Sequence, residues 1–125
     1  MANSVDDFEV YQKAVAASGG VSKILQRESF KKDLRLREQL GSASERVASA
    51  ISEGFEQSTD RHFAQYLYRA RGSTREVRTQ LIVARDRHHI NESERLELTS
   101  AYEEVARMAT GLIRYLERED RKHRR

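Results

Sequence analysis

The sequence predicts an all-α protein, an antiparallel up-down-up-down four-helix bundle. Three observations carry this prediction. The 125 residues include no proline and only 6 glycines, so long helices meet few breaks. Apolar residues recur in steps of three and four along most of the chain, which is the period of a helix with one buried face. The stretches between these patterns are short, and short connections make successive helices antiparallel.

The first two helices are predicted in the N-terminal half of the chain. The first pattern is weak and surrounds a Gly-Gly pair: Phe8, Tyr11, Val15, Ile24 and Leu25. The second pattern is stronger: Leu36, Leu40, Ala43, Val47, Ala50 and Ile51. Ser29 is the expected N-cap of the second helix, and Gly54 is expected to help end it.

The third and fourth helices have the strongest patterns. The third carries an unbroken heptad seam: Phe63, Leu67, Ala70, Thr74, Val77, Leu81, Ala84 and His88. Ser58, Thr59 or Asp60 can cap its start. The fourth repeats this rhythm: Leu98, Tyr102, Val105, Ala109, Leu112 and Leu116. Asn91, with Glu94 three residues later, has the form of a capping box and predicts the start of the fourth helix.

The chain is predicted to form a single domain over residues 1–120, followed by a basic, disordered tail over residues 121–125. The formal net charge is +3, but the charge is unevenly distributed. Residues 61–87 hold seven arginines against two acidic residues, whereas residues 92–120 hold four arginines against eight acidic residues. A basic helix followed by an acidic one indicates either neutralisation between neighbouring helices or an anionic partner.

Composition and motifs argue against several classes of protein. The sequence has no cysteine, so it offers neither disulfides nor thiolate metal sites, and this fits a reducing cytoplasm. Residues 1–10 are acidic and lack the apolar core of a signal peptide, and no apolar run is long enough to span a membrane. No phosphate-binding loop, nucleophile elbow or zinc-protease motif occurs. We therefore expect a cytoplasmic protein that is not an enzyme and uses no metal or cofactor.

A Gly-Ser pair, Gly72-Ser73, lies in the middle of the third predicted helix, where glycine is about 1 kcal/mol less favourable than alanine. Folding the second helix back on the third about a pivot near Ser58 brings Gly72 level with Ser44, in a stretch of small residues. The pair would let the two backbones approach closely. We therefore predict a packing role rather than a ligand-binding one, because glycine-rich phosphate motifs follow a strand.

Four segments resemble, in order, the four helices of a small bacterial four-helix bundle family: FEVYQKAV (8–15), LREQLGSASERVASAISEGF (36–55), FAQYLYRARGSTREVRTQL (63–81) and EEVARMATGLIRYL (103–116). This family includes the intervening-sequence protein encoded inside bacterial 23S rRNA genes, often labelled an S23 ribosomal protein. The chain is also similar to the accessory variability protein of diversity-generating retroelements.

The resemblance is sharpest in SEGF (52–55) and ARGSTRE (70–76). These stretches contain the motif residues Glu53, Gly54, Gly72, Ser73 and Glu76. Two positions depart from the family pattern, because Ala50 replaces the usual Asn and Ala48 replaces a frequent Pro. The resemblance implies a bundle that assembles as a ring, commonly a homopentamer. It also implies a role with RNA and, in some members, assistance to a reverse transcriptase.

Arginines share one side of the third predicted helix with two apolar residues: Tyr68, Arg71, Arg75, Arg78, Ile82 and Arg85. Such flanking positions commonly pair with acidic residues on a neighbouring helix, and Glu97, Glu103 and Glu104 of the fourth helix are available for this. The other interpretation is a basic strip that contacts phosphates and stacks Tyr68 on unpaired bases. The tail adds salt-dependent attraction to any polyanion through Arg121, Lys122, Arg124 and Arg125.

Together, the residues and the resemblance predict a non-enzymatic oligomeric adaptor that binds structured RNA through this arginine strip and the tail. The alternative is a protein-binding scaffold whose arginines form intersubunit salt bridges. Apolar residues outside the core seams favour association: Tyr66, Tyr68, Ile82, Val83, Leu96, Met108 and Ile113. The alternative for the last two is that they widen the core stripe of the fourth helix. The expected partners are further copies of the chain, RNA and, in a retroelement setting, a reverse transcriptase, but no membrane.

Overall fold

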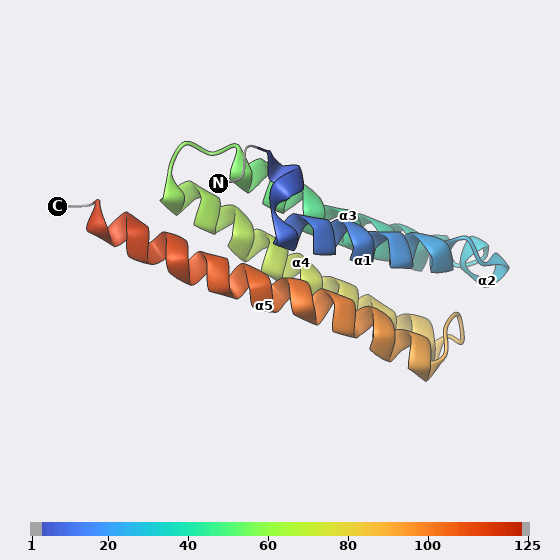
Figure 1. The fold of residues 1–125 in the computed structure, drawn as a ribbon. Coiled ribbons are helices and arrows are strands. Elements are labelled where there is room, and N and C mark those ends of the chain that lie inside the picture. The colour runs from blue at the N-terminus through green and yellow to red at the C-terminus, as the bar shows by residue number, and fades with distance from the viewer. Residues whose placement is uncertain (1–3, 124–125) are drawn as a thin grey trace.

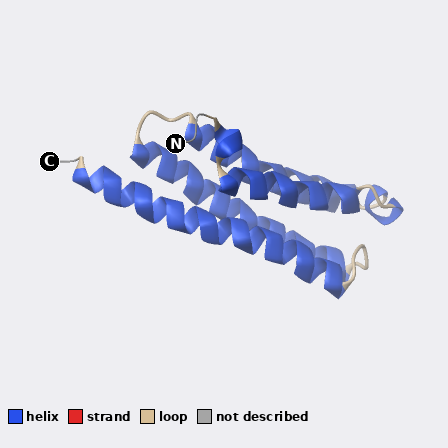
Figure 2. Cartoon of the chain, viewed as in Figure 1, coloured by secondary structure: helices blue, strands red, loops and turns tan. Residues whose placement is uncertain are grey.

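The computed structural model describes residues 4–123, and every regular element among them is helical (Figure 1, Figure 2). A short 3-10 turn, η1 (Val5–Asp7), precedes the α-helices. These are α1 (Glu9–Leu25), α2 (Glu28–Lys31), α3 (Leu34–Phe55), α4 (Asp60–Asp86) and α5 (Glu92–Lys122). The all-α prediction is confirmed, and within the described range four of the five helices are long.

The four long helices lie lengthwise beside one another (Figure 1). α1 contacts α3 and α5, and α4 also contacts α3 and α5. Tyr68, in the first half of α4, donates a hydrogen bond to Glu117 near the end of α5. Arg85, near the end of α4, donates one to Glu92 at the start of α5. α4 and α5 therefore run in opposite directions, as their short connection predicts.

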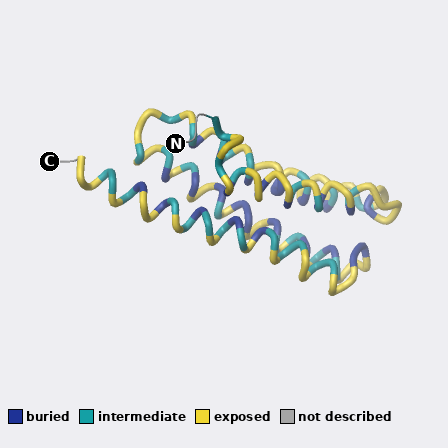
Figure 3. The backbone as a smooth tube through the Cα atoms, viewed as in Figure 1, coloured by how far each residue is buried: buried dark blue, intermediate teal, exposed yellow. Residues whose placement is uncertain are grey.

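All four long helices contribute to the apolar core on the inner side of the molecule (Figure 3). Most residues of the predicted seams are buried, including Leu40, Val47, Ile51, Leu67, Val77, Leu81, Tyr102 and Val105. Ile113, predicted to lie off the α5 seam, is only 2% exposed and belongs to the core. His88 is exposed, because α4 ends before it and its φ of 65° turns the chain away. The core is thus wider on α5, and shorter on α4, than the heptad pattern predicts.

Local capping interactions set the helix boundaries. At the start of α4, the Thr59 side chain accepts a hydrogen bond from a first-turn amide. At the start of α5, Asn91 and Glu94 each bond the other's backbone amide, so the predicted capping box is confirmed. The prediction of Ser29 as an N-cap is wrong. Ser29 lies inside α2, and Asp33 occupies the N-cap position of α3 after a break in the helix.

Side-chain contacts tie α2 to the α4–α5 connection at one end of the molecule. The His89 ring stacks on Phe30 with centroids 4.4 Å apart, and His89 Nε2 lies 2.9 Å from Asp33 Oδ2. Arg87 also donates to the Asp33 carboxylate, at 3.0 Å. The pKa of Asp33 is lowered, most strongly by the hydrogen bond with His89 and next by the hydrogen bond from Arg87. These contacts hold the connection against the start of α3.

The tight helix contact occurs at Gly54 rather than at Gly72. Gly54 is buried, and a Cβ atom on it would lie 2.9 Å from both Phe63 Cδ1 and Tyr66 Cβ of α4. α3 continues past Gly54, so this residue provides contact rather than termination. Gly72 is exposed, and a Cβ there would meet nothing within 4 Å, so the packing prediction is wrong for Gly72. Its neighbour Ser73 is buried instead, since successive helical residues point in different directions.

The core includes polar side chains beside its apolar ones. Tyr102 is fully buried, and burial raises the pKa of its phenol to about 12, while the nearby Ser44 hydroxyl acts in the opposite direction. Ser44 donates its own hydrogen bond to the Gly41 carbonyl at 2.9 Å. The Tyr102 hydroxyl is close to Ser44 but makes no hydrogen bond of good geometry with any residue in the described range. This hydroxyl is therefore a buried polar group without a well-formed hydrogen bond.

Candidate nucleic-acid interface

The predicted arginine strip follows the side of α4 that borders α5, and its first two members are bonded to α5. The Tyr68 hydroxyl donates to Glu117 at 3.1 Å, a contact that raises the pKa of Tyr68. Arg71 donates to the Thr110 hydroxyl at 3.1 Å and lies 4.9 Å from the centre of the Tyr68 ring. Tyr68 is 41% exposed, but the contact of its ring with Arg71 occupies part of the surface on which a base could stack.

Arg85, at the other end of the strip, belongs to an ion-pair network. It pairs with Asp86 and with Glu92, and Glu92 also pairs with Arg95. The pKa of Glu92 is lowered to about 2, most strongly by the hydrogen bonds from Arg95 and next by that from Arg85. The acidic residues expected to neutralise the strip were Glu97, Glu103 and Glu104, but the structure uses Glu92 and Glu117 from the two ends of α5.

Arg75 and Arg78 differ from the rest of the strip. Arg75 is exposed and Arg78 is half-buried. Neither side chain has an ion pair or a hydrogen bond with any residue between 4 and 123. An arginine without a carboxylate keeps its five N–H donors free for another planar anion, such as a phosphate. These two residues form the free centre of the strip.

A groove between the N-terminal part of α4 and the C-terminal part of α5 brings two more arginines together. Arg61 of α4 and Arg121 of α5 line it, together with Tyr68 and the two acidic residues Glu117 and Asp120. In the described part of the chain neither of these arginine side chains forms an ion pair. The two helices therefore present basic side chains from both sides of one groove.

The basic tail is partly helical. α5 extends through Arg121 to Lys122, two residues beyond the predicted domain boundary. Lys122 pairs with Glu119 at 3.2 Å, one turn before it. Arg124 and Arg125 lie outside the described residues. Of the predicted tail contacts, Arg121 is therefore the one that the structure places in the groove.

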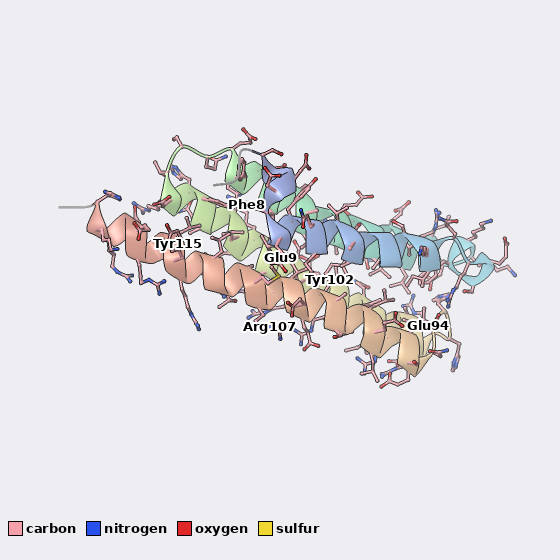
Figure 4. All side chains as sticks on the ribbon, viewed as in Figure 1. Phe8, Glu9, Glu94, Tyr102, Arg107 and Tyr115 are labelled. Carbon is pink, nitrogen blue, oxygen red and sulfur yellow. The ribbon has the colours of Figure 1, made fainter. Side chains whose placement is uncertain are left out.

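The outer face of the C-terminal half of α5 carries basic residues that the strip prediction omits. Residues 107–122 hold five basic against three acidic residues, whereas residues 92–106 hold one basic against five acidic residues. The face consists of Arg107, Gly111, Arg114, Tyr115 and Arg118 (Figure 4 labels Arg107 and Tyr115). Their spacing of three and four was visible in the sequence. Adding the charges of the whole helix concealed the division between its two halves.

The motif residues lie along the contact between α3 and α4. Glu76 pairs with Arg46 across the two helices, and Gly54 and Ser73 are buried. Glu53 is exposed, and its side chain has no ion-pair partner among the described residues. It lines a small hollow between α3 and α4 together with Arg46 and Ser73. Gly54, Ser73 and Glu76 therefore have packing or pairing roles, whereas Glu53 and Gly72 are exposed.

The family model of the 23S rRNA-intervening sequence proteins matches residues 6–111. The chain belongs to this family. The match includes every motif residue and ends within α5, so it does not describe residues 112–122. A comparison with curated proteins finds no match. The family membership expected from the sequence is thus confirmed, while the likeness to the retroelement protein stays a prediction.

Two further observations bear on what the interface can do. None of the described helices is long and apolar enough to cross a bilayer. Between residues 4 and 123, no group of three His, Asp or Glu side chains is arranged to hold a metal ion. The family is not a known enzyme family. The chemistry that the free arginines offer is the binding of anions.

Proposed function

We propose that the protein is a non-enzymatic, oligomeric adaptor that binds structured RNA in the cytoplasm through the basic face of α4 and α5. The observation that carries the proposal is the pair of unneutralised arginines, Arg75 and Arg78, in a member of an rRNA-associated family. The other two arginines of the strip, Arg71 and Arg85, have partners within the chain. A guanidinium group without such a partner is free to bind a phosphate through two parallel hydrogen bonds.

The groove extends this surface toward the end of α5. Arg61 and Arg121 line it without carboxylate partners in the described range. Tyr68 lines the groove with them, and an incoming phosphate or base can compete for its exposed contact with Glu117, whereas the contact of Arg71 with Thr110 is partly buried. Arg85 is the least available member, since it already bonds two carboxylates. The proposed RNA path therefore runs from the middle of α4 toward the C-terminal end of α5.

The test is a comparison of charge-reversal variants. Arg75→Glu with Arg78→Glu should weaken binding of a hairpin RNA at low salt at least tenfold, because two phosphate contacts become repulsions. The matched control is Lys31→Glu with Lys32→Glu, which makes the same change of charge on two exposed residues at the end of α2. Fluorescence anisotropy measures both affinities. Equal losses in the two variants would refute the assigned face, and no binding by the wild-type protein would refute the function.

We also propose that the long helices form the antiparallel up-down-up-down bundle and that copies of the chain assemble, as the family resemblance implies, into a ring of five. Some predicted contact residues are unsuitable, because Ile113 is buried and Val83 and Met108 pack against the core. The exposed apolar residues that remain from the prediction are Tyr68, Ile82 and Leu96. A reverse transcriptase as a further partner follows from the retroelement likeness alone.

The second candidate is a protein-binding scaffold without RNA affinity. It is favoured by the acidic N-terminal half of α5, which could pair with Arg75 and Arg78 of a neighbouring copy. In that case the charge reversal on α4 would lower the mass of the assembly. The RNA adaptor instead predicts an unchanged mass with a weakened RNA affinity, so light scattering on the same variant separates the two.

A further inference from the structure

We propose that the C-terminal half of α5 carries a second RNA contact, in which Tyr115 stacks on an unpaired base while Arg114 and Arg118 bind the adjacent phosphates. This inference rests on the proposed RNA-binding function and adds the feature that the RNA must have. An RNA with a single-stranded nucleotide next to its folded part would satisfy both this contact and the groove.

Tyr115 is the most exposed tyrosine described. Its side chain is 51% exposed, and its hydroxyl has no hydrogen-bond partner among residues 4–123. Tyr68 differs, because Glu117 bonds its hydroxyl and Arg71 lies against its ring. Tyr102 differs also, since the core encloses it. Tyr115 thus presents an aromatic surface that no other part of the described chain uses.

Gly111 lies one helical turn before Tyr115, on the same side of α5. A Cβ atom at Gly111 would meet nothing within 4 Å. Glycine in an exposed helix interior weakens the helix, and nothing within the described chain needs its small size. The surface one turn before Tyr115 is therefore open to an external group that approaches this face.

Arg114 and Arg118 place two like charges one helical turn apart. Both are exposed, and neither has an ion-pair partner in the described part of the chain. Like charges at this spacing destabilise an isolated helix, and an anion between them relieves the repulsion. The acidic residues nearby, Glu117 and Glu119, are half-buried and engaged by a tyrosine of α4 and a lysine of α5. The repulsion is thus left for a ligand to offset.

The combination fits an unpaired nucleotide better than a second copy of the chain. Aromatic rings flanked by arginines bind single-stranded nucleic acid by stacking and by phosphate contact. An α5–α5 contact would need an apolar seam, but the centre of this face holds Ser100, Glu103 and Arg107. The two large apolar residues on the face, Leu96 and Tyr115, are 19 positions and about 28 Å apart.

The experiment compares two hairpin RNAs that differ only in a short single-stranded overhang containing 2-aminopurine. The wild-type protein should bind the overhang RNA about tenfold more tightly than the blunt one and quench the fluorescence of the base analogue. Tyr115→Ala should remove both effects, whereas Tyr115→Trp should keep them. Val15→Ala is the matched control, because it removes a comparably exposed apolar side chain from α1, away from the proposed contacts.

A second variant separates the ring contact from folding. Gly111→Leu should raise the melting temperature, because it improves the helix, yet it should weaken the preference for the overhang, because it adds a bulky side chain to the open surface one turn before Tyr115. Equal binding of both RNAs by the wild type would overturn the inference and leave the proposed function standing. No binding of either RNA would overturn both. A Tyr115→Ala variant that lowers the assembly mass and leaves the overhang preference intact would assign the surface to protein contact and overturn the inference.

Discussion

Replacing Gly54 with alanine tests the contact between α3 and α4 at a single atom. The added Cβ would lie 2.9 Å from Phe63 Cδ1 and from Tyr66 Cβ, closer than real side chains approach each other. The phenylalanine ring can rotate, but Tyr66 Cβ is fixed to the backbone of α4. The substitution must therefore move the two helices apart or displace α4 along its axis.

The expected loss follows from two opposing effects. Overpacking of this kind costs about 1–3 kcal/mol, and alanine recovers about 1 kcal/mol of helix propensity. Because Tyr66 Cβ cannot move without its backbone, the cost lies in the upper part of this range, about 2–3 kcal/mol, and we expect Gly54→Ala to lower the free energy of unfolding by about 1–2 kcal/mol. Gly72→Ala is the matched control. Its Cβ meets no neighbour, so only the propensity gain remains, and we expect stabilisation by up to about 1 kcal/mol.

Urea unfolding followed by far-UV circular dichroism measures both changes, with light scattering to check that the assembly mass is unaltered. The predicted order of stability is Gly72→Ala, then wild type, then Gly54→Ala. The reasoning is refuted if Gly54→Ala is as stable as the wild type. It is also refuted if Gly72→Ala is less stable at unchanged mass, because Gly72 would then have a contact within the chain that the structure lacks.

Three further predictions concern the core, the acid response and assembly. Tyr102→Phe removes a buried hydroxyl without a well-formed hydrogen bond, so the free energy of unfolding should stay within about 1 kcal/mol of wild type or rise, and a larger loss would contradict this. Hydrogen bonds from Arg27, first, and from the Asn91 backbone lower the pKa of Glu94 from 4.5 to about 2, so the stability it adds is complete above pH 4.5 and is lost as the pH falls toward 2. Glu94→Gln should therefore flatten the decline of the urea midpoint between those pH values, and an unchanged decline would be the contrary result. The mass in solution should exceed one 14.5 kDa chain at micromolar concentration, with five chains expected, and a monomer would rule out the ring.

The helical fold was predictable because its signals are local and periodic. The seam residues Leu67, Val77 and Leu81 are buried as their spacing predicts, and Asn91 and Glu94 form the predicted cap. Such patterns depend on residues a few positions apart in the sequence. They therefore identify a helix and its buried side without knowledge of its neighbours.

Contacts between helices were less predictable. A pivot near Ser58 gives the level of Gly72 along α3 but not the direction in which Gly72 points, and Gly72 points to solvent. The tight position, Gly54, depends on how closely α3 and α4 approach near their connection. That distance is a property of the packed molecule, and no spacing of residues along one helix contains it.

The candidate site shows the same division. The strip on α4 could be recognised in the sequence, because its residues recur at steps of three and four. Which of them are already bonded depends on the α5 residues that lie opposite. Arg85 meets Glu92 and Tyr68 meets Glu117, whereas Arg75 and Arg78 remain unpaired among the described residues. The basic half of α5 could have been found from the sequence by dividing the helix into halves. Separating free from paired arginines required the structure.

The salt dependence of RNA binding tests the central claim most directly. The logarithm of the binding constant for a hairpin RNA should fall linearly with the logarithm of the salt concentration. Each phosphate that the protein neutralises should contribute about 0.9 to the magnitude of the slope. Arg75→Glu with Arg78→Glu should reduce that slope by about 2, while the variant with both Lys31 and Lys32 reversed should leave it nearly unchanged. A wild-type protein that shows no RNA binding at low salt, or a slope indifferent to Arg75 and Arg78, would contradict the account.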